Sequence, residues 1–190
     1  SLKIKNSKNK YLKNSSNYIF IVGMPRSGST LLENILSLNP EVTDMGEVNF
    51  LEESIKEAKD FEDVYDLYEK KVINQFQSSI IYTDKSLFNY MYCAIISNFF
   101  PKAKIINCIR NPLDNILSIY RANFLKQSFS FSLTDISSLY VHYFETMEEY
   151  KIKYGENIYD YHYEDLIENP HNIIPGIINW LDWDWDEKYL

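Results

Sequence analysis

The sequence of 190 residues is poor in cysteine, histidine and positive charge. Its two cysteines, Cys93 and Cys108, lie in apolar runs with no second cysteine or histidine nearby, and the three histidines show no metal-ligand spacing. This excludes a disulfide framework and predicts buried free thiols and no metal site. With 19 Lys and Arg against 27 Asp and Glu, the net charge of −8 argues against a general nucleic-acid-binding protein.

Long apolar runs are also missing from the sequence. No stretch approaches the roughly 20 apolar residues that a membrane helix requires, so we expect no transmembrane segment. Free thiols fit a reducing compartment, and a cytoplasmic location follows as the expectation. Because the chain begins at Ser1 and not at Met, a lost N-terminal targeting segment stays open.

Apolar and aromatic residues are abundant. Hydrophobic residues make up 45% of the chain, including 11 Phe, 16 Tyr and 3 Trp, which is enough to form a core. We find no internal repeat and no linker rich in Pro and Gly. The sequence therefore predicts one domain over residues 18–190 behind a flexible basic arm over residues 1–17, for which an anion-binding role is the alternative.

Short β-rich runs alternate with segments of helical periodicity. The predicted strands are 18–22, 80–83, 104–109 and 157–162. The predicted helices are 29–38, 48–77 (in one or two pieces), 88–99, 112–125, 134–154 and 163–180, and residues 126–133 are predicted to form a loop. This alternation predicts an α/β fold with three layers, in which helices flank both faces of a central parallel sheet. Ligands of such folds bind at the carboxyl ends of the strands.

Residues 23–30, GMPRSGST, lie between the first predicted strand and the first predicted helix. A glycine, four residues, a second glycine and small hydroxyl residues form the layout of a P-loop, which binds an anion through backbone N–H groups at a helix N-terminus. Ser29 stands where nucleotide triphosphatases place a lysine, and the positive charge lies within the loop, at Arg26. A P-loop kinase or nucleotide hydrolase, and a non-catalytic nucleotide-binding domain, are therefore alternatives to the function that follows.

The stretch YIFIVGMPRSGSTLLENILSLNPEVTDMGEVNFL resembles the start of sulfotransferase domains that use 3′-phosphoadenosine 5′-phosphosulfate (PAPS). The spacing to GEVNFL is similar to the branch with tyrosylprotein sulfotransferases and the bacterial domains associated with tetratricopeptide repeats. Two later blocks, DK with FPKAKIINCIRNPLDNILSIYRANF, and YHYEDLIENP, extend the resemblance to the end of the chain. It implies in-line transfer of a sulfuryl group from PAPS to a hydroxyl or amine of unknown class, with adenosine 3′,5′-bisphosphate (PAP) as product and no metal.

The resemblance also implies which residues bind the donor. PRSGST is similar to the loop that grips the 5′-phosphosulfate, Arg110 and Ser118 have the spacing of the 3′-phosphate site, and Tyr163 matches a tyrosine near the adenosine. The implied donor-binding residues are Arg26, Ser27, Gly28, Ser29, Thr30, Arg110, Ser118 and Tyr163. Arg121 is a further candidate, although the family places an arginine four residues after the serine, where this chain has Ala122.

Three residues are implied in catalysis. Arg26 lies at the leaving oxygen, Lys85 stabilises the transferring sulfuryl group, and Glu47 takes the proton of the acceptor, with Asp44 as its substitute. The residues alone leave simpler alternatives open. These are an exposed Lys85 at a helix start, a Glu47 carboxylate in the first turn of a helix that interacts only with the helix dipole, and an ion pair of Arg110 with Asp114. Related domains usually continue past LDWDWDEKYL, so we expect this domain to lack its C-terminal part.

Overall fold

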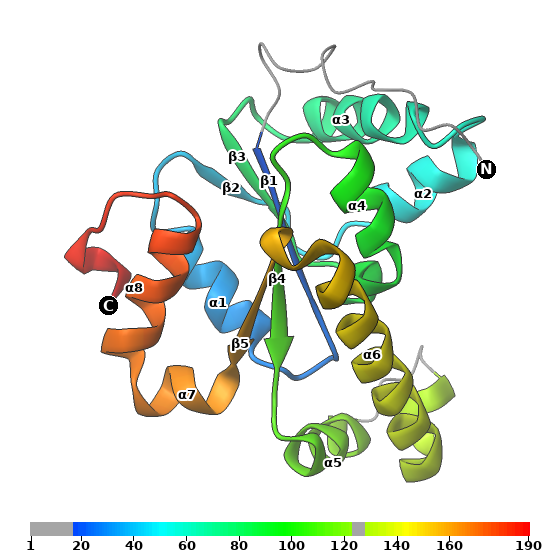
Figure 1. The fold of residues 1–190 in the computed structure, drawn as a ribbon, viewed down its shortest axis with the longest axis vertical. Coiled ribbons are helices and arrows are strands. Elements are labelled where there is room, and N and C mark those ends of the chain that lie inside the picture. Colours follow the sequence, from blue (N-terminus) through cyan, green and yellow to red (C-terminus); the bar gives the residue numbers. More distant parts are fainter. Residues whose placement is uncertain (1–16, 123–127) are drawn as a thin grey trace.

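The computed structural model describes residues 17–122 and 128–190, so almost all of the predicted basic arm lies outside the described residues. The described chain contains one parallel sheet with the strand order β2-β3-β1-β4-β5 (Figure 1). Its strands are β1 (Asn17–Gly23), β2 (Val42–Asp44), β3 (Ile81–Asp84), β4 (Lys104–Ile109) and β5 (Ile158–His162). Every neighbouring pair is parallel, as the alternation of strands and helices predicts.

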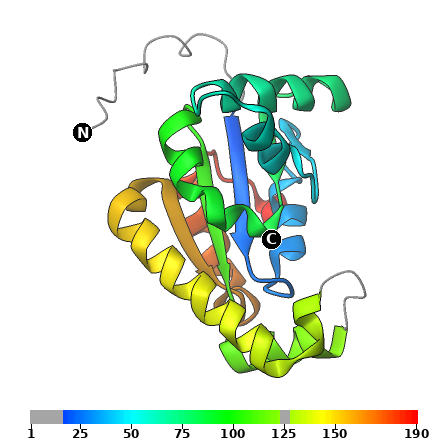
Figure 2. The ribbon, with the colours of Figure 1, turned by 90° about the vertical axis from the view of Figure 1, so that its right-hand side faces the viewer.

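Helices cover both faces of the sheet (Figures 1 and 2). One face carries α1 (Ser29–Leu36), α7 (Tyr163–Glu168) and α8 (Pro170–Trp180). The other face carries α2 (Phe50–Glu57), α3 (Asp63–Gln75), α4 (Cys93–Phe99) and α6 (Leu133–Tyr154), with α5 (Pro112–Ala122) at its end. The three-layer α/β architecture expected from the sequence is confirmed.

The central strand β1 explains why the layers form. Its side chains alternate between the two faces, as the period of a strand requires. Tyr18 and Phe20 point into the core under α3 and α4, whereas Ile19 and Ile21 pack against α1 and α8. Tyr18 and Phe20 are fully buried, which is typical of a parallel strand covered on both sides.

The structure refines several boundaries. Residues 48–77 form the two helices α2 and α3, and the predicted helix over 88–99 starts as the 3-10 helix η1 (Leu87–Tyr92) before α4. The sequence did not predict β2, because its three residues are too few for a recognisable pattern. The prediction of a loop over 126–133 is wrong in its described part, where Ser128–Phe131 form the 3-10 helix η2. The predicted burial of the two free cysteines is confirmed.

The order of the strands predicts where a ligand binds. From β1 the chain runs to β2 at one edge of the sheet, and from β4 it runs to β5 at the opposite edge. Connections that diverge in this way open a crevice at the carboxyl ends of the two strands. The loops after β1 and β4 therefore meet at the same place.

Within residues 17–122 and 128–190, we find no helix with the length and apolarity needed to cross a membrane.

Candidate functional site

Residues 23–30, called the phosphate loop below, join β1 to α1 through an unusual backbone. Arg26 has a φ of 67° and Gly28 a φ of 88°. Arg26 is therefore a non-glycine residue in the left-handed region, where a strained backbone often marks a functional site. Helix α1 begins immediately afterwards, at Ser29, and the first N–H groups of a helix have no partner inside it. The turn thus directs free N–H groups and the positive end of the helix dipole towards one point.

Two tyrosines from β5 and α7 support the phosphate loop from outside. The Tyr161 hydroxyl donates a hydrogen bond to the carbonyl of Gly28 at 3.2 Å. A Cβ atom at Gly28 would lie 2.3 Å from Cδ2 of Tyr163 and 2.9 Å from the hydroxyl of Tyr161. Glycine is therefore required for close packing as well as for its φ angle. Tyr161 was not among the predicted residues, since a tyrosine within a buried strand looks like an ordinary core residue.

Arg110, directly after β4, contacts the phosphate loop. Its Nη1 donates to the carbonyl oxygen of Arg26 at 2.9 Å, and its guanidinium lies 4.9 Å from the ring centre of Tyr163. Its Nε is buried, and the described residues offer it no hydrogen-bond partner. The Oγ of Ser27 in the loop is in the same situation. Buried donors without partners are rare and point to a ligand that completes the site.

Helix α5 brings Ser118 to the same place. The Nε of Arg26 donates to Oγ of Ser118 at 3.3 Å, so residues 92 positions apart in the sequence are in contact. A cavity of about 420 Å³ lies here, and its lining includes Ser118, Arg121 and Asp114 beside Arg26 and Arg110. The three arginines of this lining are all the arginines in the sequence. The three guanidinium groups of this acidic protein thus line one cavity. Such an arrangement favours the binding of phosphate groups.

Asn115 is a second residue that the sequence prediction missed. Its side chain is fully buried, and its Nδ2 donates to the carbonyl of Pro25 at 2.9 Å, which ties α5 to the phosphate loop. The available signal is its position four residues before the buried Ile119, because this spacing places a polar amide on the buried face of α5. Buried amides at such positions need a specific partner.

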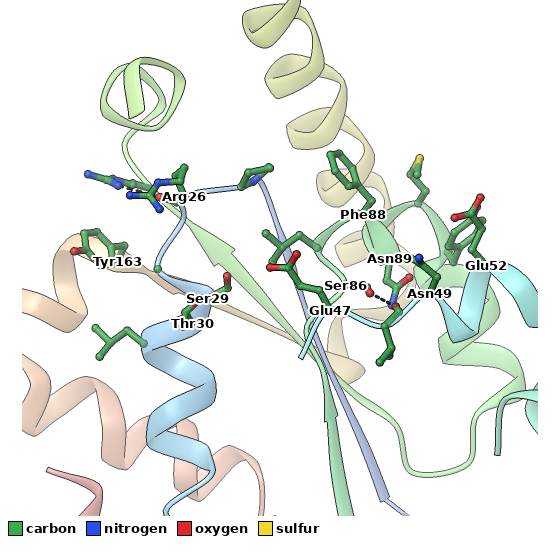
Figure 3. A pocket seen from close by; sticks show the side chains of 18 residues that line it. Arg26, Ser29, Thr30, Glu47, Asn49, Glu52, Ser86, Phe88, Asn89 and Tyr163 are labelled. Atoms are coloured by element: carbon green, nitrogen blue, oxygen red, sulfur yellow. Dashed lines mark hydrogen bonds between the residues drawn. The ribbon is translucent and has the colours of Figure 1, made fainter. Parts of the chain in front are cut away.

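A larger cavity of about 540 Å³ adjoins the phosphate loop (Figure 3). Arg26, Ser29, Thr30 and Tyr163 lie on one side of it. The opposite side comes from the segments after β2 and β3 and includes Glu47, Asn49, Glu52, Ser86, Phe88 and Asn89. Arg26 and Arg110 line both cavities and therefore stand at the boundary between them.

Glu47, which lines the larger cavity, forms an ion pair with Lys85, which belongs to neither cavity lining. Lys85 Nζ lies 3.0 Å from Oε1 of Glu47 and 3.8 Å from Oε2 of Glu33. The Glu47 side chain is 72% exposed, whereas that of Lys85 is only 8% exposed. The alternative of an exposed lysine is therefore wrong. Lys85 directly follows the carboxyl end of β3. Asp44 is exposed at the end of β2.

Asp84 fixes the wall of the cavity next to Lys85. This carboxylate is fully buried and accepts hydrogen bonds from the Tyr68 hydroxyl at 2.8 Å, the Ser86 N–H at 2.9 Å and the Asn89 side chain at 3.2 Å. Burial raises the pKa of Asp84 to about 7, although these hydrogen bonds oppose the rise. The network joins the end of β3 to η1, which contributes Asn89 to the cavity.

The described residues contain no cluster of three or more His, Cys, Asp or Glu side chains suited to a metal ion. The cationic groups at this site are the three arginines of the smaller cavity and Lys85. The acidic groups are Asp114 in the smaller cavity, Glu47 and Glu52 in the larger one, and Glu33 beside Lys85.

Known proteins resemble this chain in sequence and in fold. The model of the sulfotransferase family matches residues 18–75 and 60–187. An uncharacterized protein of Aquifex aeolicus (strain VF5) is 27% identical over 199 aligned positions, which cover 90% of this chain and 26% of that protein. The chain thus spans about a quarter of the length of this relative.

Solved structures share the fold. A sulfotransferase from Alicyclobacillus acidocaldarius has a TM-score of 0.67 at 18% identity, with 90% of this chain and 82% of that chain covered. The sulfotransferase domain from the curacin biosynthetic pathway has a TM-score of 0.68 at 18% identity, with 94% and 78% covered. A mouse sulfotransferase complexed with PAP has a TM-score of 0.62 at 15% identity, with 91% and 61% covered.

The close packing at Gly28 yields a first prediction. We expect Gly28→Ala to lower the free energy of unfolding by about 1–3 kcal/mol more than Gly46→Ala, measured by urea denaturation. Both glycines have positive φ angles, but a Cβ at Gly46 meets nothing within 4 Å. The control thus separates backbone strain from the clash with the two tyrosines. A second substitution, Tyr163→Ala, should restore part of the loss, and equal losses for the two glycine variants would contradict the packing argument.

The raised pKa of Asp84 yields a second prediction. The folded state binds this proton more tightly than the unfolded chain, so the stability from protonated Asp84 is complete below about pH 4 and is lost as the pH rises towards 7. Relative to Asp84→Asn, the wild-type chain should lose up to roughly 4 kcal/mol across this window, at about 1.4 kcal/mol per pKa unit. Urea denaturation at constant ionic strength measures the difference, with Asp66→Asn as a control on the exposed side of α3. If the difference in the free energy of unfolding between the wild type and Asp84→Asn is constant or grows with pH, the raised pKa of Asp84 is wrong.

Proposed function

Because the chain belongs to the sulfotransferase family, we propose that it transfers a sulfuryl group from PAPS to an acceptor hydroxyl or amine. The observation that carries this proposal is the contact between the phosphate loop and Arg110. Through this contact, the N–H groups of the phosphate loop and the guanidinium group of Arg110 lie together at the carboxyl ends of β1 and β4, where they would hold the two ends of one bisphosphorylated adenosine. A shared fold alone would not support this, since one fold serves many reactions.

The residues present fit the donor. The N–H groups of residues 27–30 and the side chain of Arg26 would hold the 5′-phosphate, as helix N-termini hold anions. Arg110 and Ser118 would hold the 3′-phosphate, and the buried Nε of Arg110 supports this because it still lacks a partner among the described residues. The Tyr163 ring, packed on Arg110, offers a face to the adenosine. A mouse sulfotransferase of similar fold was crystallised with PAP, which supports the same class of donor.

The larger cavity would hold the reacting groups. When bound, PAPS supplies the activated sulfuryl group. Glu47 would accept the proton of the acceptor as the acceptor oxygen or nitrogen bonds to sulfur and the bond from sulfur to the bridging oxygen breaks. Lys85 and Arg26 would offset the negative charge that develops on this leaving oxygen. These roles need positioning and charge, which the pair of Glu47 with Lys85 and the strained loop at Arg26 provide.

A P-loop kinase or nucleotide hydrolase is the less favoured alternative. Ser29 occupies the position of the lysine that contacts the terminal phosphates of a triphosphate, and the three arginines lie in the lining of the smaller cavity.

The acceptor would enter beside Phe88, Met91 and Tyr92, which give the far wall of the larger cavity an apolar part.

Donor binding is the first test of this function. Titration calorimetry in EDTA should show that PAP binds without magnesium. Arg110→Ala should weaken PAP about 10- to 100-fold, because a charge-assisted hydrogen bond contributes about 1.5–3 kcal/mol. The matched control is adenosine 5′-monophosphate, which lacks the 3′-phosphate and should lose less affinity in the same variant, because only the support of the phosphate loop by Arg110 is removed for this ligand. Equal losses for both nucleotides, or binding of ATP only with magnesium, would contradict the proposal.

Transfer itself is the second test. With ³⁵S-labelled PAPS and a panel of phenols, aliphatic alcohols, tyrosyl peptides and amines, the wild-type chain should label at least one acceptor. Glu47→Gln and Lys85→Met should each reduce kcat about 10²- to 10⁴-fold, as loss of a proton-transfer or charge-stabilising group does. Glu53→Gln on the exposed side of α2 is the control and should retain the wild-type rate. Wild-type rates in both site variants would refute the assigned roles.

A further inference from the structure

Glu33 is a buried carboxylate that the proposed mechanism has not used. It lies on α1, the helix that follows the phosphate loop, and is only 5% exposed. Burial of a carboxylate is costly unless charges and hydrogen bonds compensate it. Burial indeed raises the pKa of Glu33, and the nearby charge of Lys85 opposes the rise. A buried carboxylate such as that of Glu33 is therefore expected to have a specific role at this position.

Glu33 connects three segments of the site. Its Oε1 accepts a hydrogen bond from the Thr83 hydroxyl on β3 at 3.2 Å. The backbone N–H of Gly46, in the segment after β2, lowers the pKa of Glu33 and so favours its charged form. Its Oε2 lies 3.8 Å from the ammonium group of Lys85. The carboxylate thus accepts a hydrogen bond from a neutral donor while it faces a buried cation.

Lys85 therefore has two counter-ions in different environments. Glu47 is closer and exposed, whereas Glu33 is more distant and buried. When Glu47 accepts a proton in the proposed reaction, it loses its negative charge. Lys85 would then lose its nearer counter-ion at the moment when it must face the leaving oxygen. Only the charge of Glu33 persists through this step.

We propose that Glu33 is a positioning residue that holds the Lys85 ammonium at the end of β3 throughout the transfer, so that Glu47 is free to take the acceptor proton. This inference rests on the proposed function. It gives a role to Glu33, which lines neither cavity.

The experiment compares Glu33→Gln with Glu33→Asp in the transfer assay with labelled PAPS and the best acceptor of the panel. Glutamine keeps the length of the side chain and an oxygen for the Thr83 hydrogen bond but removes the charge, whereas aspartate keeps the charge and is shorter. We expect kcat to fall about tenfold or more in Glu33→Gln and less in Glu33→Asp, with the KM for PAPS and the Kd for PAP within about twofold of wild type. A purely structural role predicts the reverse order, with Glu33→Gln close to wild type.

A second measurement tests the contact without any activity. If Glu33 and Lys85 compensate each other, Lys85→Met leaves a buried unpaired carboxylate, and the double variant Glu33→Gln with Lys85→Met should unfold at a higher urea concentration than Lys85→Met alone. A double variant that is less stable than Lys85→Met would overturn the pairing.

The outcomes separate this inference from the proposed function. A wild-type chain that neither binds PAP nor transfers label overturns the proposed function and the inference with it. An active wild-type chain with Glu33→Gln at the same kcat, or with Glu33→Asp as the slower variant, overturns the inference alone.

Discussion

The hydrogen bond from Arg110 to the carbonyl of Arg26 is the interaction on which the site depends. It joins the ends of β4 and β1, two adjacent strands whose onward connections diverge to opposite edges of the sheet. The strand order therefore creates the crevice, and this contact fixes its two sides relative to each other. Tyr163 packs on Arg110 and against Gly28, and Asn115 holds Pro25, so the loop is fixed from β5, α5 and α7 at once. An anion site needs such preorganisation because its donors must already point at the charge that arrives.

The cationic side chains of the site are also arranged in a specific way. The protein carries a net charge of −8, yet its three arginines share one cavity lining. The fourth cation of the site, Lys85, is buried between two carboxylates and is therefore fixed in place. This division suits the proposed reaction, in which the guanidinium groups would bind phosphate and Lys85 would face the charge that develops during transfer. It also explains why the acidic composition is compatible with a strongly anionic nucleotide.

Much of this arrangement was predictable from the sequence, and the exceptions have physical reasons. The phosphate loop is local, so GMPRSGST between a strand and a helix is enough to place it, and the predicted strand over 104–109 fixes Arg110 at the carboxyl edge. Tyr161, Glu33 and Asn115 were missed because their roles come from contacts between segments more than 45 residues apart. Lys85 was placed correctly at the end of a strand, but its burial depends on Glu33 and Glu47, which no local pattern reveals.

In the proposed complex, one adenosine bisphosphate spans the phosphate loop and Arg110. A crystal structure of the chain with PAP would show whether it does. We expect the 5′-phosphate on the N–H groups of residues 27–30 and the 3′-phosphate within hydrogen-bond distance of Arg110 and Ser118. A nucleotide bound with its 3′-phosphate directed away from Arg110, or bound elsewhere on the molecule, would contradict it.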